Sequence, residues 1–365
     1  MGYGVMSTAR RTSLTAAALV VATPLVVSCA DRRPEARPTT VVTATTEAPE
    51  PLTAQVARRE FRTFTINDDV ARAAGDERLA LTWVSDGESP LTAAEYRKAA
   101  FDGDPVRRYD YAEPKLYVPK LEPDVYPQWF VASVPRTVRG EAESTRTVLM
   151  AFILRAPGQR WTLSLRTVLA PKARQPKVVT DAGGYATALT TSDTSVLIRP
   201  REMPGIQATV ASEGPDSVAA KVMRAGPVTT GYYEQSRKAR RKARGKELTL
   251  QTVITATPYP IFPLRTEHGG GLVLYSLYRN SVTGVRDKEK EKGTKPPIPA
   301  EIEHLLDGTV EGNEIHVSET LQFAAYDPAR PKDEDEDEDA PRPKADVIAD
   351  AGGVYKAVTP PPKTP

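Results

Sequence analysis

The feature of this sequence that most constrains its fold is an internal repeat. The phrase VVTDAGGYATAL at residues 178–189 returns as VIADAGGVYKAV at residues 347–358. An earlier pair follows the same order along the chain, since SPLTAAEY at 89–96 is matched by GPVTTGYY at 226–233. Self-similarity at a long spacing indicates that one structural plan is used twice. The chain therefore predicts two tandem copies of a single fold.

Two weaker matches lie between these pairs. FVAS at 130–133 is matched by VLYS at 273–276, and WTLS at 161–164 is matched by IHVS at 315–318. The spacing between partners grows from 137 residues (227 − 90) to 169 residues (350 − 181), so the second copy must contain insertions. RDKEKEKGTKPPIP at 286–299 and KDEDEDEDAPRP at 332–343 are charged and contain proline, as solvated loops do.

Each closing phrase predicts a turn that ends its copy. Gly183 and Gly184 can adopt positive φ without a Cβ penalty, and Asp181 can accept hydrogen bonds from backbone amides across a turn. A phosphate-binding loop would instead need a helix after the glycines and a lysine at a fixed spacing. Neither is present, so we expect turns.

The order of elements predicts the α+β class. Residues 54–84 favour a helix with possible breaks at Asn67–Asp69 and Gly75-Asp76, and a second helix is predicted from Thr92. Strand-like PKLYVP, QWFVASV, TVLMAFIL and RWTLSLRTVL follow, the last two around a turn in RAPGQ. In the second half, DSVAAKVM and TGYYEQSRKARRKA predict helices, and LTLQTVITA, GLVLYSLY and EIHVSETLQFAAY predict strands.

This order favours two tandem domains, residues 54–190 and 199–360, each with helices packed on a curved antiparallel sheet. The predicted arrangement resembles the NTF2-like fold, in which helices partly close a curved sheet into a cone. That resemblance implies that each domain could enclose a pocket.

The N-terminal residues predict export and a lipid anchor. Arg10 and Arg11 precede an apolar run, 14–27, which is typical of a secretory signal peptide and shorter than the roughly 20 residues of a membrane span. VVSC at 26–29 resembles the lipobox of bacterial lipoproteins, and Cys29 is the only cysteine. We predict a signal peptide at 1–28 and lipidation of Cys29; the alternatives are an unlipidated signal peptide and an N-terminal anchor.

Residues 29–53 are rich in proline and threonine and predict a disordered tether. The lipobox, the tether and the twin closing phrases together resemble a group of uncharacterised lipoproteins of actinobacteria. This resemblance implies a protein on the outer face of the cell membrane, and it implies no known activity. The export route, general or twin-arginine, stays open.

No residue pattern predicts a catalytic, cofactor or metal site. His268 beside a triple glycine suits a hairpin turn, His304 in PAEIEHLLDG suits an amphipathic helical turn, and His316 suits the polar face of a strand. HExxH and GxSxG motifs are absent. We therefore predict no cofactor and favour a protein that is not an enzyme. The alternative is an envelope hydrolase with its active site in one NTF2-like pocket, which Tyr109, Tyr111 and Trp129 could line.

The charge distribution limits the partners. Outside Arg10 and Arg11, 47 basic residues balance 47 acidic ones, which argues against non-specific nucleic-acid binding. The acidic run 333–339 favours a solvated loop. A basic run could dock on anionic headgroups or wall polymers, or be solvated; its cations are Arg237, Lys238, Arg240, Arg241, Lys242, Arg244 and Lys246.

Taken together, these features predict a lipid-anchored extracytoplasmic protein that acts as a binding or scaffolding module at the cell envelope. Its expected partners are the membrane, through the anchor, and a cell-envelope protein or an anionic wall polymer. A chaperone-like role for exported proteins is a further alternative.

Overall fold

The computed structural model describes residues 50–361, apart from 291, 307–309, 311 and 332–340. Helices open the first half of the chain: α1 (Ala54–Ala74), α2 (Glu77–Leu81) and α3 (Glu88–Asp102). Five strands follow: β1 (Tyr109–Tyr111), β2 (Lys115–Tyr117), β3 (Gln128–Val138), β4 (Glu141–Leu154) and β5 (Thr162–Leu169).

The second half begins with helices in the same way: α4 (Met203–Glu213), the 3-10 helix η1 (Val218–Lys221) and α5 (Thr230–Arg244). Its strands are β6 (Leu248–Ala256), β7 (Phe262–Arg265), β8 (Gly271–Val285), β9 (Glu314–Asp327) and β10 (Asp346–Val358). Short helices lie in its loops: η2 (Glu267–Gly269), α6 (Asp287–Lys290) and η3 (Ala300–Leu305).

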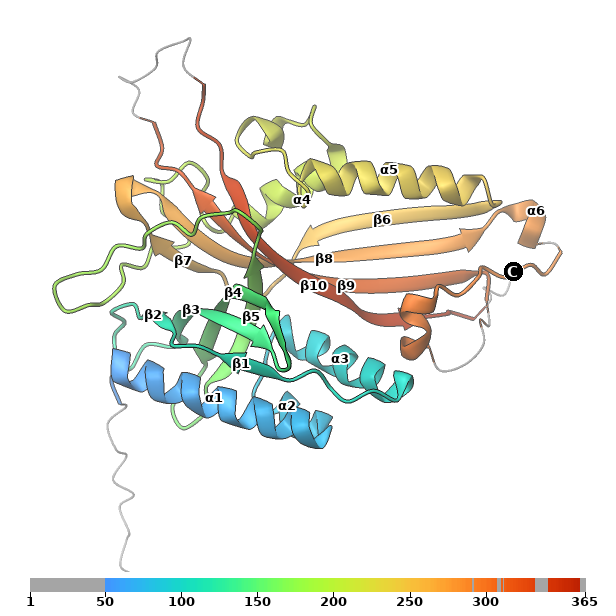
Figure 1. Ribbon diagram of the computed structural model, residues 1–365. Helices are drawn as coiled ribbons and strands as arrows, with labels where there is room; N and C mark the ends of the chain where they lie inside the picture. Colours follow the sequence, from blue (N-terminus) through green and yellow to red (C-terminus); the bar gives the residue numbers. More distant parts are fainter. Residues whose placement is uncertain (1–49, 291, 307–309, 311, 332–340, 362–365) are drawn as a thin grey trace, which may run out of the picture. The chain divides into compact units, whose positions relative to one another are not determined.

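All ten strands join one antiparallel sheet within the compact unit formed by residues 48–365 (Figure 1). The order is β1-β3-β4-β5-β10-β9-β8-β6, with β2 beside β3 and β7 beside β8. The halves meet where β5 pairs with β10, at Leu169–Ala349 and Val168–Asp350. Read outward from this junction, both halves have the same order of strands. The α+β prediction is confirmed.

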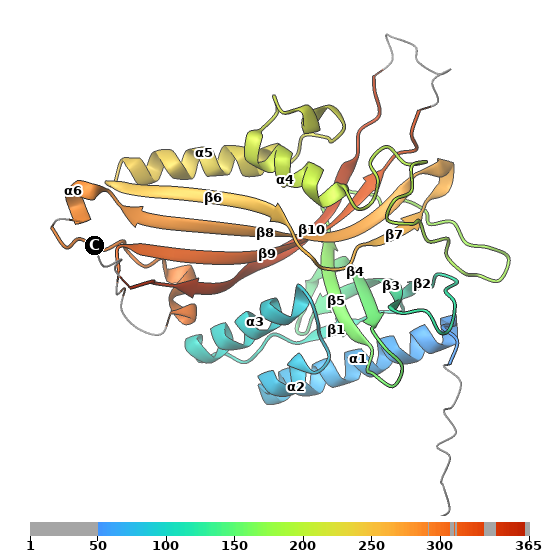
Figure 2. The same ribbon diagram turned by 180° about the vertical axis from the view of Figure 1, so that it is seen from behind.

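Helices cover both halves, and α3 spans their junction because it packs on β5 and β10. Figures 1 and 2 show α1, α2 and α3 grouped beside the strands of the first half, and α4 and α5 beside β6. Between the halves the core is shared, because one apolar cluster contains Leu149 and Leu165 from the first half and Phe262, Leu264 and Ala324 from the second. Apolar side chains from both halves therefore pack together at the junction.

Local residue chemistry explains the helix boundaries. The side chain of Thr53 accepts a hydrogen bond from Val56 N at 3.2 Å and starts α1, and Gly75, with φ 64°, ends it. Asp76 then caps α2 by accepting from Leu79 N at 2.9 Å. The break predicted at Gly75-Asp76 is confirmed, and Asn67–Asp69 stay inside α1. Two predictions were less accurate: α3 starts at Glu88, and DSVAAKVM forms only the short η1.

The first closing phrase forms the predicted turn, whereas the second forms most of β10. In the first, Gly184 N donates to Asp181 O at 3.0 Å, and Tyr185 N donates to Asp181 Oδ1 at 2.9 Å. In the second, Asp346–Val358 pair with β9 throughout their length, with two irregularities, and with β5 at Ala349 and Asp350. The turn prediction is wrong for the second phrase, because strands on both sides supply partners for its backbone.

The other repeat matches differ in whether they join corresponding elements of the two halves. The 89–96 and 226–233 pair lies in α3 and at the start of α5, and the 130–133 and 273–276 pair lies in β3 and β8. Strands β3 and β8 occupy equivalent places in the sheet. The helices differ, because α3 packs on β5 and β10 whereas α5 packs on β6. The match between 161–164 and 315–318 is wrong, because it joins β5 to β9, whose equivalent by strand order is β4.

The predicted insertions occupy equivalent loops of the sheet. Residues 286–299 lie between β8 and β9, where the first half has only Arg139 and Gly140 between β3 and β4. Residues 332–343 lie between β9 and β10, where the first half has the short connection 155–161. The second half is therefore longer mainly at two strand connections.

Candidate functional site

A pocket of about 460 Å³ with both polar and apolar lining lies where the two halves meet. Helix α3 forms one wall, strands β1, β3, β5, β9 and β10 contribute to the others, and η3 lies at the rim. Its central polar side chains are Glu88, Glu95, Tyr109, Arg136, Arg166 and Gln322. Because α3, β3 and β5 come from the first half and Gln322 from the second, both halves build this pocket.

A network of charged side chains joins α1 to α3. Arg72 of α1 is buried and donates to both carboxylate oxygens of Asp68 at 2.9 Å and to Glu95 at 2.8 and 3.1 Å. It also donates to the carbonyl oxygen of Arg107 at 2.9 Å. Burial raises the pKa of Glu95, but the charge of Arg72 outweighs this effect and the pKa lies below its ordinary value. The Glu95 carboxylate is therefore held by Arg72.

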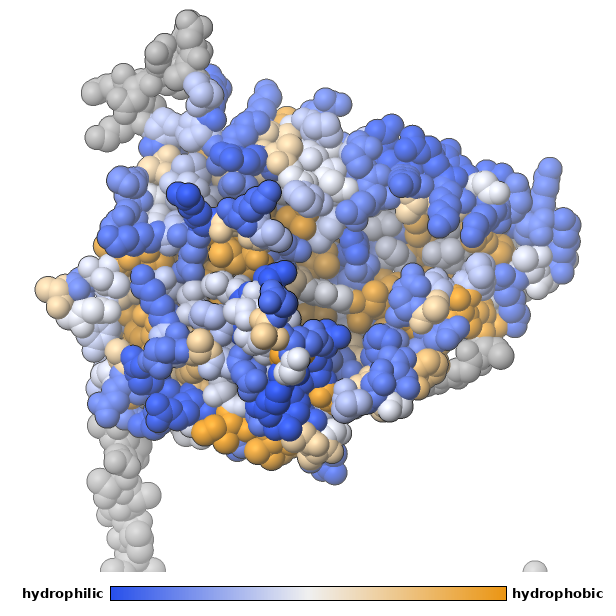
Figure 3. All heavy atoms as spheres, viewed as in Figure 1, coloured by the Kyte–Doolittle hydropathy of each residue, from blue (hydrophilic) through white to orange (hydrophobic). Residues whose placement is uncertain are grey.

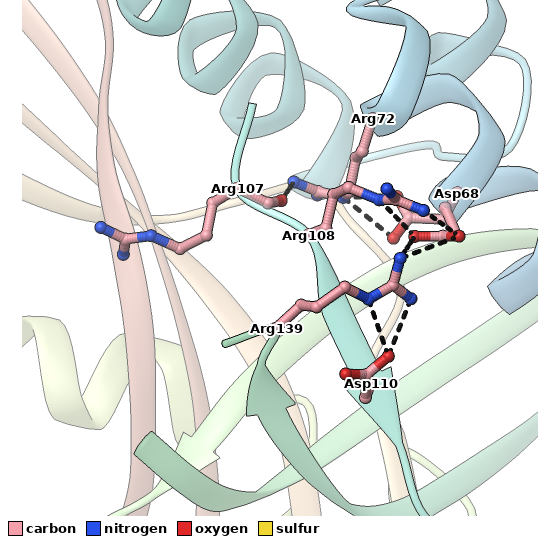
Figure 4. A network of polar contacts seen from close by, with 7 residues as sticks. Asp68, Arg72, Arg107, Arg108, Asp110 and Arg139 are labelled. Atoms are coloured by element: carbon pink, nitrogen blue, oxygen red, sulfur yellow. Dashed lines mark hydrogen bonds and ion pairs between the residues drawn. The ribbon is translucent and has the colours of Figure 1, made fainter. Parts of the chain in front are cut away.

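The network continues to the surface (Figure 4). Arg108 donates to Asp69 at 2.6 and 2.8 Å, and Arg139 contacts both Asp69 and Asp110. Figure 4 shows the guanidinium of Arg107 pointing away from these pairs, so Arg107 contributes its backbone carbonyl. These ion pairs join α1 to β1 and to the turn after β3, and they position the strand that carries Tyr109.

A second buried ion pair lies deeper in the pocket. Arg166 Nη2 of β5 contacts Glu88 Oε1 of α3 at 2.6 Å, with side-chain exposures of 13% and 2%. Burial raises the pKa of Glu88, and the charge of Arg166 offsets only part of that shift. Both carboxylates of α3 that face the pocket are thus engaged by a guanidinium.

Arg136 of β3 differs from the other two arginines. Its guanidinium lies 4.2 Å from the centre of the Tyr109 ring, a cation–π contact, yet it makes no ion pair with any residue that the structure describes. Its Nη1 is buried and has no hydrogen-bond partner within the same residues. Burial and the like charge of Arg166 lower the pKa of Arg136.

Gln322 of β9 brings a second unpaired donor from the other half. Its side chain is fully buried, and its Oε1 accepts from the backbone N–H of Arg166 at 3.1 Å. That contact fixes the orientation of the amide, and Nε2 then has no partner among the described residues. A Cβ at Gly87, beside the start of α3, would lie 3.0 Å from this nitrogen.

Comparison with known proteins places the chain in a family. A family model described as "Domain of unknown function (DUF8094)" matches residues 49–356. The chain belongs to this family. An "Uncharacterized lipoprotein" of Streptomyces avermitilis is 26% identical over 222 residues, which cover 60% of this chain and 63% of that relative. The match thus spans less than two thirds of the relative's length. No solved structure matches the chain.

In this family member, six of the seven predicted docking residues lie on helix α5. The basic run covers the C-terminal part of α5 and extends to Lys246, and α5 has no fully buried residue. Arg237 pairs with Glu234 at 3.2 Å, and no other cation of the run has an ion pair within the described residues. Figure 3 shows strongly hydrophilic residues gathered over α5. Cys29 and the acidic run 333–339 lie outside the described residues.

The histidines lie near their predicted places. His268 has φ 62° in η2 between β7 and β8, His304 lies in the helical turn η3 at the pocket rim, and His316 of β9 contacts Glu314 at 3.0 Å. Among the described residues, His, Cys, Asp and Glu form no group of three that could hold a metal ion. Within the same residues, no helix is long and apolar enough to cross a membrane.

The three aromatic residues expected to line a pocket inside one NTF2-like domain do not lie together around the pocket between the halves. Tyr109 lines the pocket, whereas Tyr111 lines a separate hollow of about 250 Å³ and Trp129 packs on Phe262 with ring centres 5.5 Å apart. Sequence analysis missed Arg136, Arg166 and Gln322. Charged or amide residues inside apolar strands were a usable signal, but only the β5–β10 junction shows that they share one pocket.

Proposed function

We propose that this protein is a lipid-anchored binding module at the cell envelope, exported through residues 1–28 and held on the outer face of the membrane by Cys29. The lipoprotein name of the Streptomyces relative supports the anchor. The pocket between the halves supports a binding role, because it combines buried polar donors with a volume that suits a small molecule. That pocket is the single observation that carries the proposal.

We further propose that residues 54–190 and 199–360 are two copies of one ancestral fold. The identical strand order on either side of the β5–β10 junction supports this view. Strand register supports it too, since Val131 pairs with Tyr117 and Ala151, and its counterpart Leu274 pairs with Phe262 and Ala324. The closer likeness to an NTF2-like cone in each copy stays a prediction.

The geometry favours binding over hydrolysis. Glu88 and Glu95 have pKa values shifted in opposite directions, as an acid and base pair would. Both are nevertheless held by arginines, at 2.6 Å and 2.8 Å, so neither carboxylate is directed at a substrate. The hydrolase alternative has no further support from the described residues.

The binding role is tested by a substitution that fills the pocket. Gly353 lines it, and a Cβ there would have Leu91 Cδ2 at 3.9 Å as its nearest neighbour, so Gly353→Leu fills the space without a backbone clash. Gly353→Ala is the matched control. We expect small molecules extracted from wild-type protein and from Gly353→Ala to be missing from Gly353→Leu, as measured by mass spectrometry. Equal small-molecule content in all three, or none in any, would overturn the binding role.

The anchor has its own test. Cys29→Ala removes the acylated sulfur, and the attachment of more than one acyl chain is what gives lasting membrane residence. We expect this variant to leave the membrane fraction and appear in the soluble fraction after cell lysis. Continued sedimentation with membranes at high salt would contradict the anchor.

We also propose that the basic run of α5 docks on anionic phospholipid headgroups of the same membrane. Six of its seven cations lack an ion pair within the described residues, and each contributes about 1 kcal/mol near an anionic surface. Neutral glutamine at Lys238, Arg241 and Lys242 should weaken binding to vesicles that contain phosphatidylglycerol. Unchanged binding, or binding that is insensitive to salt, would count against docking.

A further inference from the structure

The two unpaired donors identify the chemistry of the ligand, an inference that rests on the proposed binding role of the pocket. We propose that the pocket takes the carboxylate or phosphate group of a small organic anion, held by Arg136 and Gln322. The anionic group would lie against α3 and the strands at the β5–β10 junction. A short apolar part of the same molecule would fill the remaining space.

The first reason is that Arg136 carries a charge without a counter-ion. Burying a guanidinium is costly unless an anion or a full set of acceptors compensates it. Arg72 and Arg166 follow this rule through ion pairs with Glu95 and Glu88. Arg136 contacts the Tyr109 ring at 4.2 Å and feels the charge of Glu88 through space, but it has no ion-pair contact within the described residues. A ligand anion would supply the missing acceptor for Nη1.

The second reason is independent and comes from the other half of the chain. Gln322 is fully buried on β9, and an unsatisfied buried donor costs about 1–3 kcal/mol. Because its Oε1 is taken by Arg166 N, the group left for a ligand is the donor Nε2. Two hydrogen-bond donors that lack acceptors therefore belong to residues that line the same pocket, and they favour a ligand that accepts hydrogen bonds.

The remaining charges of the pocket do not oppose an anion. Glu88 and Glu95 are neutralised by their arginines. Lys98 pairs with Asp102 at 2.6 Å at the surface, and Glu301 is exposed at the rim, where solvent screens its charge. His304, also at the rim, has its pKa lowered by burial and by Lys98.

The apolar lining limits the rest of the ligand. Leu91, Ala94, Val168, Ala351 and Val354 border the same space. A pocket of about 460 Å³ with both kinds of lining suits a small amphiphilic molecule better than an inorganic ion alone. The ligand is therefore an acid with a short hydrocarbon or aromatic body.

The test uses the full lipidated protein in nonionic detergent and isothermal titration calorimetry. The probes are hexanoate, hexyl phosphate, inorganic phosphate and hexanol. We expect hexanoate or hexyl phosphate to bind at least tenfold more tightly than hexanol. Arg136→Met should weaken that binding at least tenfold, and Gln322→Glu should do the same, because it keeps the acceptor for Arg166 N and replaces the donor by a carboxylate.

Arg146→Met is the matched control. Arg146 lies opposite Arg136 in the β3–β4 register, is exposed and does not line the pocket, so its variant should bind like wild type. A melting curve separates an effect on binding from an effect on folding. If Arg136 serves to bind a ligand, the Arg136→Met variant should melt at no lower temperature than wild type. If Arg136→Met fails to fold, Gln322→Glu decides the question.

The outcomes divide clearly. Preference for hexanoate assigns a carboxylate, preference for hexyl phosphate assigns a phosphate ester, and equal binding of inorganic phosphate assigns free phosphate and overturns the apolar body. Failure of all three anions, or equal affinity in Arg136→Met and wild type, overturns the anion site. In that case Gly353→Leu still reports on the binding role, which survives if its small-molecule content differs from wild type.

Discussion

Asp181-Ala182-Gly183-Gly184 and Asp350-Ala351-Gly352-Gly353 consist of the same four residues and have different structures. The first is an exposed turn in which Asp181 Oδ1 accepts from Tyr185 N at 2.9 Å and Gly184 has φ 80°. The second lies in β10 between β9 and β5, and there Gly352, the first glycine of the pair, has φ 140°. The two glycines have exchanged roles between the copies.

The difference shows how neighbouring strands decide the conformation of an ambiguous segment. Around the first copy only isolated pairings occur, such as Val178 with Thr266 and Thr180 with Ala186. A buried backbone group needs a partner, and in the second copy β9 offers partners throughout the segment. Asp-Ala-Gly-Gly can close a turn, but it extends where a ladder is available.

The largest effect is expected at the glycine that is closest to another strand. A Cβ at Gly352 would lie 2.3 Å from Thr320 O, so Gly352→Ala must displace β9 from β10 and should lower the free energy of unfolding by about 2–4 kcal/mol. At Gly183, which precedes Gly184 in the turn, the nearest atom would be Asp181 Oδ1 at 3.3 Å. Gly183→Ala should cost less than about 1 kcal/mol. Urea denaturation of both variants measures the difference, and equal losses would contradict it.

A pH effect is expected beside the second copy. Asp327 is the last residue of β9 and follows Tyr326, which pairs with Asp346 of β10. Burial raises the pKa of Asp327 to about 7 despite the hydrogen bond that Ile198 N donates to it. The folded state then binds the proton more tightly than the unfolded chain, whose pKa is about 3.9. The contribution of Asp327 to the free energy of unfolding is therefore fully present below about pH 4. It is lost as the pH rises to about 7, by up to about 1.4 kcal/mol per pH unit.

Asp327→Asn should remove this contribution, so the difference between its unfolding free energy and that of wild type should vary across the same pH range. Subtracting the two curves cancels the effect of other buried acids, including Glu88. The matched control lies beside the first copy, where Glu267 makes an exposed ion pair with Lys177 at 2.5 Å. Glu267→Gln should change stability by less than about 0.5 kcal/mol. Parallel curves for Asp327→Asn and wild type would argue against a buried carboxyl.

The smallest effect distinguishes the two aspartates. Asp181→Ala removes the hydrogen bond to Tyr185 N and should cost about 0.5–1 kcal/mol. The side chain of Asp350 is exposed and accepts no hydrogen bond within the described residues, so Asp350→Ala should change stability by less than about 0.5 kcal/mol. Thermal unfolding of both variants checks the order. A loss for Asp350→Ala that equals or exceeds the loss for Asp181→Ala would contradict this order.

Sequence patterns identified much of this fold. The apolar strands around Phe130, Leu149 and Leu274 and the helix boundary at Gly75 were predicted because strong local preferences specify them. The two charged stretches were assigned to loops because solvated loops are rich in charge and proline, and both lie at strand connections of the second half. β10 was missed, since its glycine pair predicts a turn when partners are unknown. The candidate site was also missed, because Arg136 and Gln322 are 186 residues apart (322 − 136) and no local signal connects them.

By itself, the sequence determined the α+β class and most of its elements, because each element depends on residues close together in the chain. Only the tertiary structure decided that both halves build one sheet and that a guanidinium from one half and an amide from the other line the same pocket. The physical reason is that backbone pairing between β5 and β10 and the burial of polar side chains depend on partners far away in the chain. Whether a donor is satisfied depends on its surroundings, which the residue type alone does not specify.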